Sequence, residues 1–357
     1  MGLWDWIIDA LTTGDDGPSR STPNATSSSS ATAVLDAPTD DQRDGDAGSE
    51  LEETDRWWAP EGVTAIDPIG IELPEWSMQA RVLEEKLISH FDGHDLTLPP
   101  MPKVAEHVLT RLRDPKCSAS DVAGDLSEDQ VIAASVLRIA NSPLYRGVTK
   151  ILSLQAAVAR LGTGAIRTLM MHQSFRAAMF QQNSGDKQLA ELIWHGSLAG
   201  AAIMRHLARI LKRDEDEAFL IGLLHDIGNV ITLRIVMEHE RMTHEPIDIP
   251  AFEFLCHETH QEFGELITDA WGLPDDLKSL VADHHSYPEP NDPLRTERLM
   301  LILTDMISQM LGFAQPAQYD LANATVVSDL GLAGSPDFER LLAELPEKID
   351  KTVSSLS

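Results

Sequence analysis

Eight histidine and carboxylate side chains in the middle of this sequence are candidate metal ligands. Two of them, His225 and Asp226, are adjacent inside the apolar run 219–228. Burying such a pair is costly unless each side chain has a partner, and a cation satisfies both at once. The other candidates lie before and after the pair: Glu191, His195, His260, His284, His285 and Asp305. The residue types therefore predict a metal site.

The spacing indicates how these ligands could meet. Glu191 and His195 are four residues apart, which is about 40° around a helix, so both could point at one ion. His225 offers a nitrogen, and Asp226 offers a carboxylate that can bridge two ions. Such a mixed nitrogen and oxygen site suits Fe, Mn, Zn or Mg better than a thiolate-binding metal. With two or three ions it could activate water against a phosphodiester, and Asp226 is the candidate catalytic residue.

The composition limits the partners of the chain. The 357 residues include 57 acidic and 28 basic side chains, for a net charge of −29, which repels nucleic-acid backbones. The two cysteines, Cys117 and Cys256, form no CxxC pair and indicate a reducing cytoplasm. The sequence has no run of about 18 apolar residues, so we expect no membrane-spanning helix. The chain is expected to be a cytoplasmic protein that does not bind nucleic acid.

The N-terminal region is predicted to be separate from the body. Residues 1–13 form an amphipathic helix with its apolar side chains on one face: Leu3, Trp4, Ile7, Ile8 and Leu11. This helix could dock onto a signalling partner, onto the body of the chain or onto a lipid interface. The Ser-, Thr- and Asp-rich residues 14–56 lack the large apolar side chains needed to offset the entropy of folding. We expect them to be a disordered linker.

From about residue 78 the apolar spacing is helical, and no convincing alternating strand pattern is found. Residues 98–102 contain three prolines and must be extended. Helices are expected over 103–113, 120–126, 130–141, 153–161, 164–180, 188–211 and 216–237. The C-terminal extension 291–357 ends in an amphipathic stretch, 338–356, that could pack on the body or form a homodimer contact. The predicted fold class is all-α.

Several motifs in this order resemble the HDOD family, the HD-related output domains of bacterial signalling proteins. They are Leu98-Pro-Pro-Met-Pro102, Ile139-Ala-Asn-Ser-Pro-Leu-Tyr145, Ser153–Gly162, Ala218–Gly228, His260 with Gly264, Trp271-Gly-Leu-Pro274 and His284-His285. The resemblance implies two helical lobes over residues 78–290, the second related to HD-type metal-dependent phosphohydrolases. The family spacing to Gly264 favours His260 over His257 as a ligand.

The order of the eight candidates is also similar to that of the HD-GYP cyclic-dinucleotide phosphodiesterases, in which all eight would bind metal. Two features depart from that pattern. Gly228 is followed by Asn229 where those enzymes have a lysine, and residues 286–290 replace their Gly-Tyr-Pro segment. The resemblance therefore implies a bacterial signal-transduction output or scaffold protein that binds a protein or small ligand. The alternative is a metal-dependent phosphohydrolase acting on a nucleotide-type phosphoester.

Overall fold

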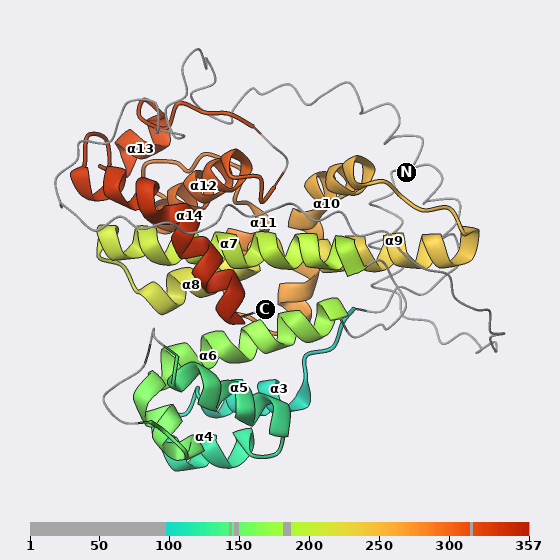
Figure 1. Ribbon diagram of the computed structural model, residues 1–357, viewed down its shortest axis with the longest axis vertical. Coiled ribbons are helices and arrows are strands. Elements are labelled where there is room, and N and C mark those ends of the chain that lie inside the picture. The colour runs from blue at the N-terminus through green and yellow to red at the C-terminus, as the bar shows by residue number, and fades with distance from the viewer. Residues whose placement is uncertain (1–97, 143–144, 146–149, 181–186, 315–316, 357) are drawn as a thin grey trace, which may run out of the picture.

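The computed structural model describes residues 98–142, 145, 150–180, 187–314 and 317–356. The helix and linker predicted over residues 1–56, and the start of the body at residue 78, lie outside the described residues. Within the described part every regular element is a helix and there is no strand, so the predicted all-α fold is confirmed. The helices form two lobes joined by one long helix (Figure 1).

The first lobe contains three short helices and the first half of the long helix. These are α3 (Lys103–Arg111), α4 (Ala119–Leu126), α5 (Gln130–Ala140) and α6 (Leu154–Phe180). Side-chain caps fix where two of them begin. Ser118 and Asp121 form a capping box at α4, and the Asp129 carboxylate accepts hydrogen bonds from two backbone N–H groups at α5. Their buried faces form a small apolar core of their own.

The second lobe contains the remaining helices around a larger core. They are α7 (Lys187–Leu211), α8 (Glu215–Leu224), α9 (Asn229–Thr243), α10 (Ile249–Ala270), α11 (Asp275–Ala282), α12 (Arg295–Met310), α13 (Thr325–Asp329) and α14 (Pro336–Leu356). The central helix α7 lies against α8, α12 and α14 (Figure 1). Residues from α14, including Leu345 and Ile349, are buried in this core, so the C-terminal extension is part of the second lobe.

The long helix α6 belongs to both lobes and lies between them in Figure 1. Its first half packs in the small core, whereas Met171 and Phe175 pack in the large one. The helix is interrupted at Gly162, where φ is 77°. This is the break that the sequence predicts between 153–161 and 164–180, because a positive φ favours glycine.

Polar contacts also tie the lobes together. Arg205 on α7 donates to the Asp216 carboxylate at 2.9 Å, and the Tyr145 hydroxyl from the first lobe donates to the same oxygen at 3.3 Å. The indole N–H of Trp271 donates to the carbonyl of Pro99 at 2.9 Å. The HDOD-like motifs that contain Tyr145, Trp271 and Pro99 therefore contribute contacts between distant parts of the chain.

One sequence prediction needs correction. Residues 216–237 do not form a single helix, because α8 ends at Leu224 and α9 begins at Asn229. The intervening turn, 225–228, approaches α10 so closely that a Cβ atom on Gly228 would lie 2.0 Å from the carbonyl oxygen of His260. Any residue other than glycine at position 228 would place its Cβ atom in the space that the backbone of α10 occupies.

The segment Glu215–Thr243, which spans α8 and α9, is long and apolar enough to cross a membrane by length and composition alone. Of its most apolar window, 78% is buried inside the protein. This burial is that of a core segment packed among the other helices of the second lobe.

Candidate metal centre

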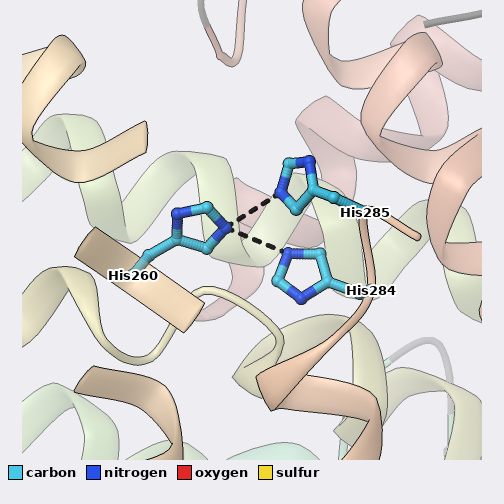
Figure 2. A group of neighbouring side chains, drawn as sticks. All are labelled: His260, His284 and His285. Atoms are coloured by element: carbon cyan, nitrogen blue, oxygen red, sulfur yellow. Dashed lines mark hydrogen bonds between the residues drawn. The ribbon is translucent and has the colours of Figure 1, made fainter. Parts of the chain in front are cut away.

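Six of the eight predicted ligands come together in the second lobe. His225 and Asp226 lie in the turn between α8 and α9, and His260 lies on α10. His284 and His285 follow α11, and Asp305 lies on α12. Figure 2 shows three of these side chains, with the ring of His260 facing those of His284 and His285.

The close packing of glycines sets the position of the first two ligands. A Cβ atom on Gly222 would lie 2.6 Å from the carbonyl oxygen of Gly200, so α7 and α8 touch backbone to backbone just before His225. The contact of Gly228 with α10 then sets the position of Asp226 relative to His260. These close approaches require residues without side chains.

The three cluster histidines with buried rings have the tautomer that a metal ligand needs. Nδ1 of His225, His260 and His284 lies 2.9, 2.8 and 3.0 Å, respectively, from a backbone carbonyl three or four residues earlier in the chain. A carbonyl only accepts, so in each neutral ring the proton is on Nδ1 and the lone pair is on Nε2. Such contacts to the second ring nitrogen are typical of metal-bound histidines.

The Nε2 atoms of three cluster histidines converge. Nε2 of His260 lies 3.2 Å from Nε2 of His284 and 2.9 Å from Nε2 of His285. Two neutral rings with lone pairs on Nε2 cannot form a hydrogen bond with each other, since neither has a proton to donate. A cation between the rings satisfies these lone pairs together, so the donor set fits a metal ion.

Asp226 lies between two groups of ligands. One carboxylate oxygen, Oδ2, is 3.3 Å from Nε2 of His225, and the other, Oδ1, is 3.6 Å from His260 and 3.5 Å from His284. Asp305 Oδ1 is also 3.3 Å from Nε2 of His225. Among the described residues, two groups have convergent donor atoms: His225, Asp226 and His284, and His260, His284 and His285. Because Asp226 has an oxygen directed at each side, it can bridge two ions.

Closely spaced histidines and carboxylates shift the pKa values of one another in the cluster. Burial lowers the pKa of His225, but the Asp226 and Asp305 carboxylates outweigh burial and raise it to about 9. Burial acts to raise the pKa of Asp226, yet the neighbouring histidines hold it well below its usual value. Burial lowers the pKa of His260 to about 4, so that ring is neutral at neutral pH. A protonated His225 therefore lies beside two ionised carboxylates, and the neutral ring of His260 lies on the other side of Asp226.

A cavity of about 110 Å³ lies next to the cluster, with Asp226, His260, His285 and Asp305 in its wall. The other described lining residues are Leu192, Ile193, Gly196, Ser197, Asn229, Glu253, Cys256, His257, Gln309, Phe313 and Ala314. None of these described lining residues is Lys or Arg. With asparagine in place of lysine at position 229, the described part of the cavity wall contains no lysine or arginine cation.

Glu191 and His195 are not brought to this cluster. They line a second cavity on another face of α7, together with Arg176 and Trp194. The four-residue spacing does place them on one helix face, as predicted, but the face of α7 toward the cluster contains Gly196 and Ser197. The expectation that all eight candidates share one site is therefore not met by this arrangement.

The residues that contact the histidine pair from outside were not predicted from the sequence. Arg295 and Arg298 on α12 contact the segment that contains His284 and His285. The sequence does contain a pattern that could have identified Arg298. It lies seven residues before the candidate ligand Asp305, which is two helical turns along the same face.

Comparison with known proteins agrees with this architecture. The structure is similar to that of a candidate metal-dependent phosphohydrolase from Shewanella amazonensis SB2B, with a TM-score of 0.61 and 20% identity over 79% of this chain and 99% of the other. It is also similar to an HDOD domain protein of unknown function from Geobacter sulfurreducens, with a TM-score of 0.57 and 23% identity over 76% and 96% of the two chains. At these identities the likeness shows the fold.

Two curated relatives match parts of the chain. An uncharacterized protein of Treponema pallidum (strain Nichols) is 22% identical over 202 residues, which are 54% of this chain and 38% of the relative. Ribonuclease Y of Mycoplasma genitalium is 24% identical over 190 residues, 53% of this chain and 30% of the relative. The match thus spans well under half the length of either relative. The HDOD domain family matches residues 98–287, from the Pro-rich segment at the start of the first lobe to the histidine pair of the cluster, and the chain belongs to this family.

Proposed function

We propose that this chain is a bacterial signal-transduction output module of the HDOD type whose second lobe binds divalent metal ions. The convergence of the Nε2 atoms of His260, His284 and His285 is the observation that supports this function. A purely structural histidine cluster would alternate donors and acceptors, whereas two of these rings direct lone pairs at each other. Metal binding removes that conflict and also compensates the two carboxylates.

The metal content of the purified protein tests this proposal. Protein prepared without chelator or affinity nickel should contain Fe, Mn or Zn at near-stoichiometric amounts, and an Asp226→Ala variant should contain almost none. Asp350→Ala, a change at an exposed position on α14, is the matched control and should retain the metal. Equal, negligible metal in wild type and variants after incubation with each ion would refute the proposal.

Hydrolysis of a phosphoester is the second candidate function. It is supported by the cavity beside the cluster, whose wall includes the carboxylates of Asp226 and Asp305. Bound divalent ions would polarise a phosphoryl oxygen and lower the pKa of a bound water. Asp226 would hold the ions beside the cavity. Since no described lining residue is Lys or Arg, the wall favours a substrate with one phosphoryl group over a polyphosphate.

Turnover of simple chromogenic esters separates the two functions. If the centre is catalytic, metal-loaded protein should hydrolyse p-nitrophenyl phosphate or its bis-ester, and Asp226→Asn should abolish the activity. If metal raises the melting temperature but neither ester is cleaved, the centre belongs to a binding module. A matching loss in the Asp226→Asn variant excludes a contaminating phosphatase.

Signal output would then proceed through a partner protein. The amphipathic pattern of residues 1–13 supports these residues as the docking segment, because two tryptophans in a short acidic stretch need an apolar surface. Deletion of residues 1–13 should abolish capture of that partner while leaving metal content unchanged. An unchanged interaction profile would contradict this part of the proposal.

A further inference from the structure

Arg298 is a buried cation on α12, and it contacts the backbone immediately before the histidine pair. The residue is 7% exposed, and its guanidinium donates to the backbone carbonyl of Asp283, the residue immediately before His284. It also donates to the Ser279 hydroxyl on α11 at 2.6 Å and lies 2.9 Å from the Asp292 carboxylate. One side chain thus joins the end of α11 to α12.

Arg295, one turn earlier on α12, contacts the other end of the same segment. Its guanidinium donates to the backbone carbonyl of Pro288 and to the carboxylate of Asp329 at the end of α13. The Tyr287 hydroxyl donates to that same carboxylate at 3.0 Å, and the Arg295 guanidinium lies 5.9 Å from the centre of the Tyr287 ring. The Asp329 carboxylate therefore accepts hydrogen bonds both from Arg295 on α12 and from Tyr287 in the segment that follows the histidine pair.

These two arginines hold both ends of the segment 283–288, and the two histidine ligands lie between the held ends. The same helix also contains Asp305, which contacts the opposite group of ligands through His225. One rigid helix therefore fixes the spacing between the two groups. The helices α12 and α13 both follow residue 287, where the match to the HDOD family ends.

We propose that Arg298 and Arg295 are positioning residues that hold His284 and His285 in ligating geometry, and that Asp329 of the C-terminal region anchors them. This inference rests on the proposed metal-binding function and adds to it the support that the metal centre requires. The C-terminal region would thus complete the centre from outside the family-matched segment, through α12 and α13.

Outer support is needed because the ligands repel one another when no ion is bound. Without an ion, neutral rings whose lone pairs point at each other gain by turning apart, so a free segment would open. Guanidinium forks that hold the backbone on both sides prevent this and reduce the cost of organising the site when the ion binds. Loss of such outer contacts commonly weakens metal affinity by about 10–100-fold.

Arg298→Lys tests the first positioning residue, because lysine keeps the charge but cannot span three partners with a planar fork. The Kd for Zn²⁺ or Mn²⁺, measured by titration calorimetry, should rise by about 10–100-fold. The absorption spectrum of the Co²⁺-loaded variant should also differ from wild type, since it reports ligand geometry. Arg340→Lys on α14, an exposed arginine paired with Asp337, is the matched control and should leave both readouts unchanged.

Asp329→Asn is the milder test and keeps the proposal falsifiable if Arg298→Lys does not fold. It leaves the core intact but weakens the acceptor for Arg295 and Tyr287, so we expect the Kd to rise by roughly three- to tenfold. Wild-type Kd and Co²⁺ spectrum in a folded Asp329→Asn protein, or in folded Arg298→Lys, would overturn the positioning role. If wild type itself binds no metal, the proposed function fails instead, so the two failures are distinguishable.

Discussion

The two cavities beside α7 contain the same residue types arranged to opposite effect. On one side, His260, His284 and His285 bring their Nε2 atoms to 3.2 and 2.9 Å around a shared point. On the other side, His195 and Glu191 line a cavity with Arg176 and Trp194, and neither belongs to a group of convergent donors among the described residues.

The difference lies in what surrounds the side chains. His260 and His284 are fixed through Nδ1 by backbone carbonyls, and the contact of Gly228 with α10 holds the adjoining turn in place, so part of the ligand geometry is set before any ion arrives. Glu191 shares a helix face with His195 but is exposed. Residue type and spacing are enough to name a candidate metal ligand. A metal site also requires that the donor atoms converge and that surrounding residues hold the ligands in place.

The largest expected effect comes from breaking the backbone contact beneath the cluster. In Gly228→Ala the new Cβ atom would lie 2.0 Å from the His260 carbonyl oxygen and 2.6 Å from the Gly264 nitrogen. Backbone cannot yield as a flexible side chain does, so we expect a loss of at least about 3 kcal/mol in the free energy of unfolding. Urea denaturation measures this loss, and metal binding should disappear with it.

Gly124→Ala on α4 is the control for that change. A Cβ atom there has no neighbour within 4 Å, and the position is helical, so alanine should stabilise the protein by up to about 1 kcal/mol. Equal stability changes at positions 124 and 228 would show that the turn and α10 are not in contact.

The second prediction separates the two ligand groups within the cluster. Asp305→Asn keeps the size of the side chain but removes the charge that lies 3.3 Å from Nε2 of His225. The ion beside His225 and Asp226 should bind at least about tenfold more weakly, while the ion beside His260, His284 and His285 remains. Metal stoichiometry under dialysis should fall from two to one. Loss of both ions together would instead indicate a single shared site.

The fold was more predictable from sequence than the site. Helical spacing reports local preferences, and the helices that it predicts agree with the structure over α3–α7. The turn at His225 and Asp226 was not predicted, because it depends on a contact between Gly228 and α10 that is distant in sequence. The spacing of Glu191 and His195 fixes a shared face, but only packing decides which way that face points.

The third prediction concerns His172, which packs against Trp194 of the second cavity and whose pKa is shifted in the opposite direction to that of His225. His172 packs 4.9 Å from the ring of Trp194, and neither of its ring nitrogens has a hydrogen-bond partner. Burial, together with the charges of Arg176 and Arg138, lowers its pKa from 6.5 to about 3. As the pH falls below 6.5 the unfolded chain therefore takes up a proton that the folded protein does not.

Stability contributed by neutral His172 is thus complete above about pH 6.5 and is lost as the pH falls toward 3. Between pH 7 and pH 5 the loss is about 2 kcal/mol, from a limit of about 1.4 kcal/mol per pH unit. His172→Leu should reduce the acid sensitivity of chelator-treated protein by that amount in urea denaturation. The exposed His107→Leu should not, and equal acid sensitivity in wild type and His172→Leu would contradict the prediction.

The smallest expected effect is that of changing Glu191 and His195, and it tests directly whether the two cavities are independent. In the Glu191→Gln, His195→Gln double variant, both predicted ligands lose their metal affinity while the size of each side chain changes little. Because neither residue reaches the cluster, the Kd for Zn²⁺ or Mn²⁺ should stay within about twofold of wild type. The Co²⁺ spectrum should also be unchanged, and His260→Gln is the positive control that must lose metal. A loss comparable to that of His260→Gln would mean that α7 rotates toward the cluster when metal binds. The eight residues would then act as one site, as the order of ligands in the sequence first indicates.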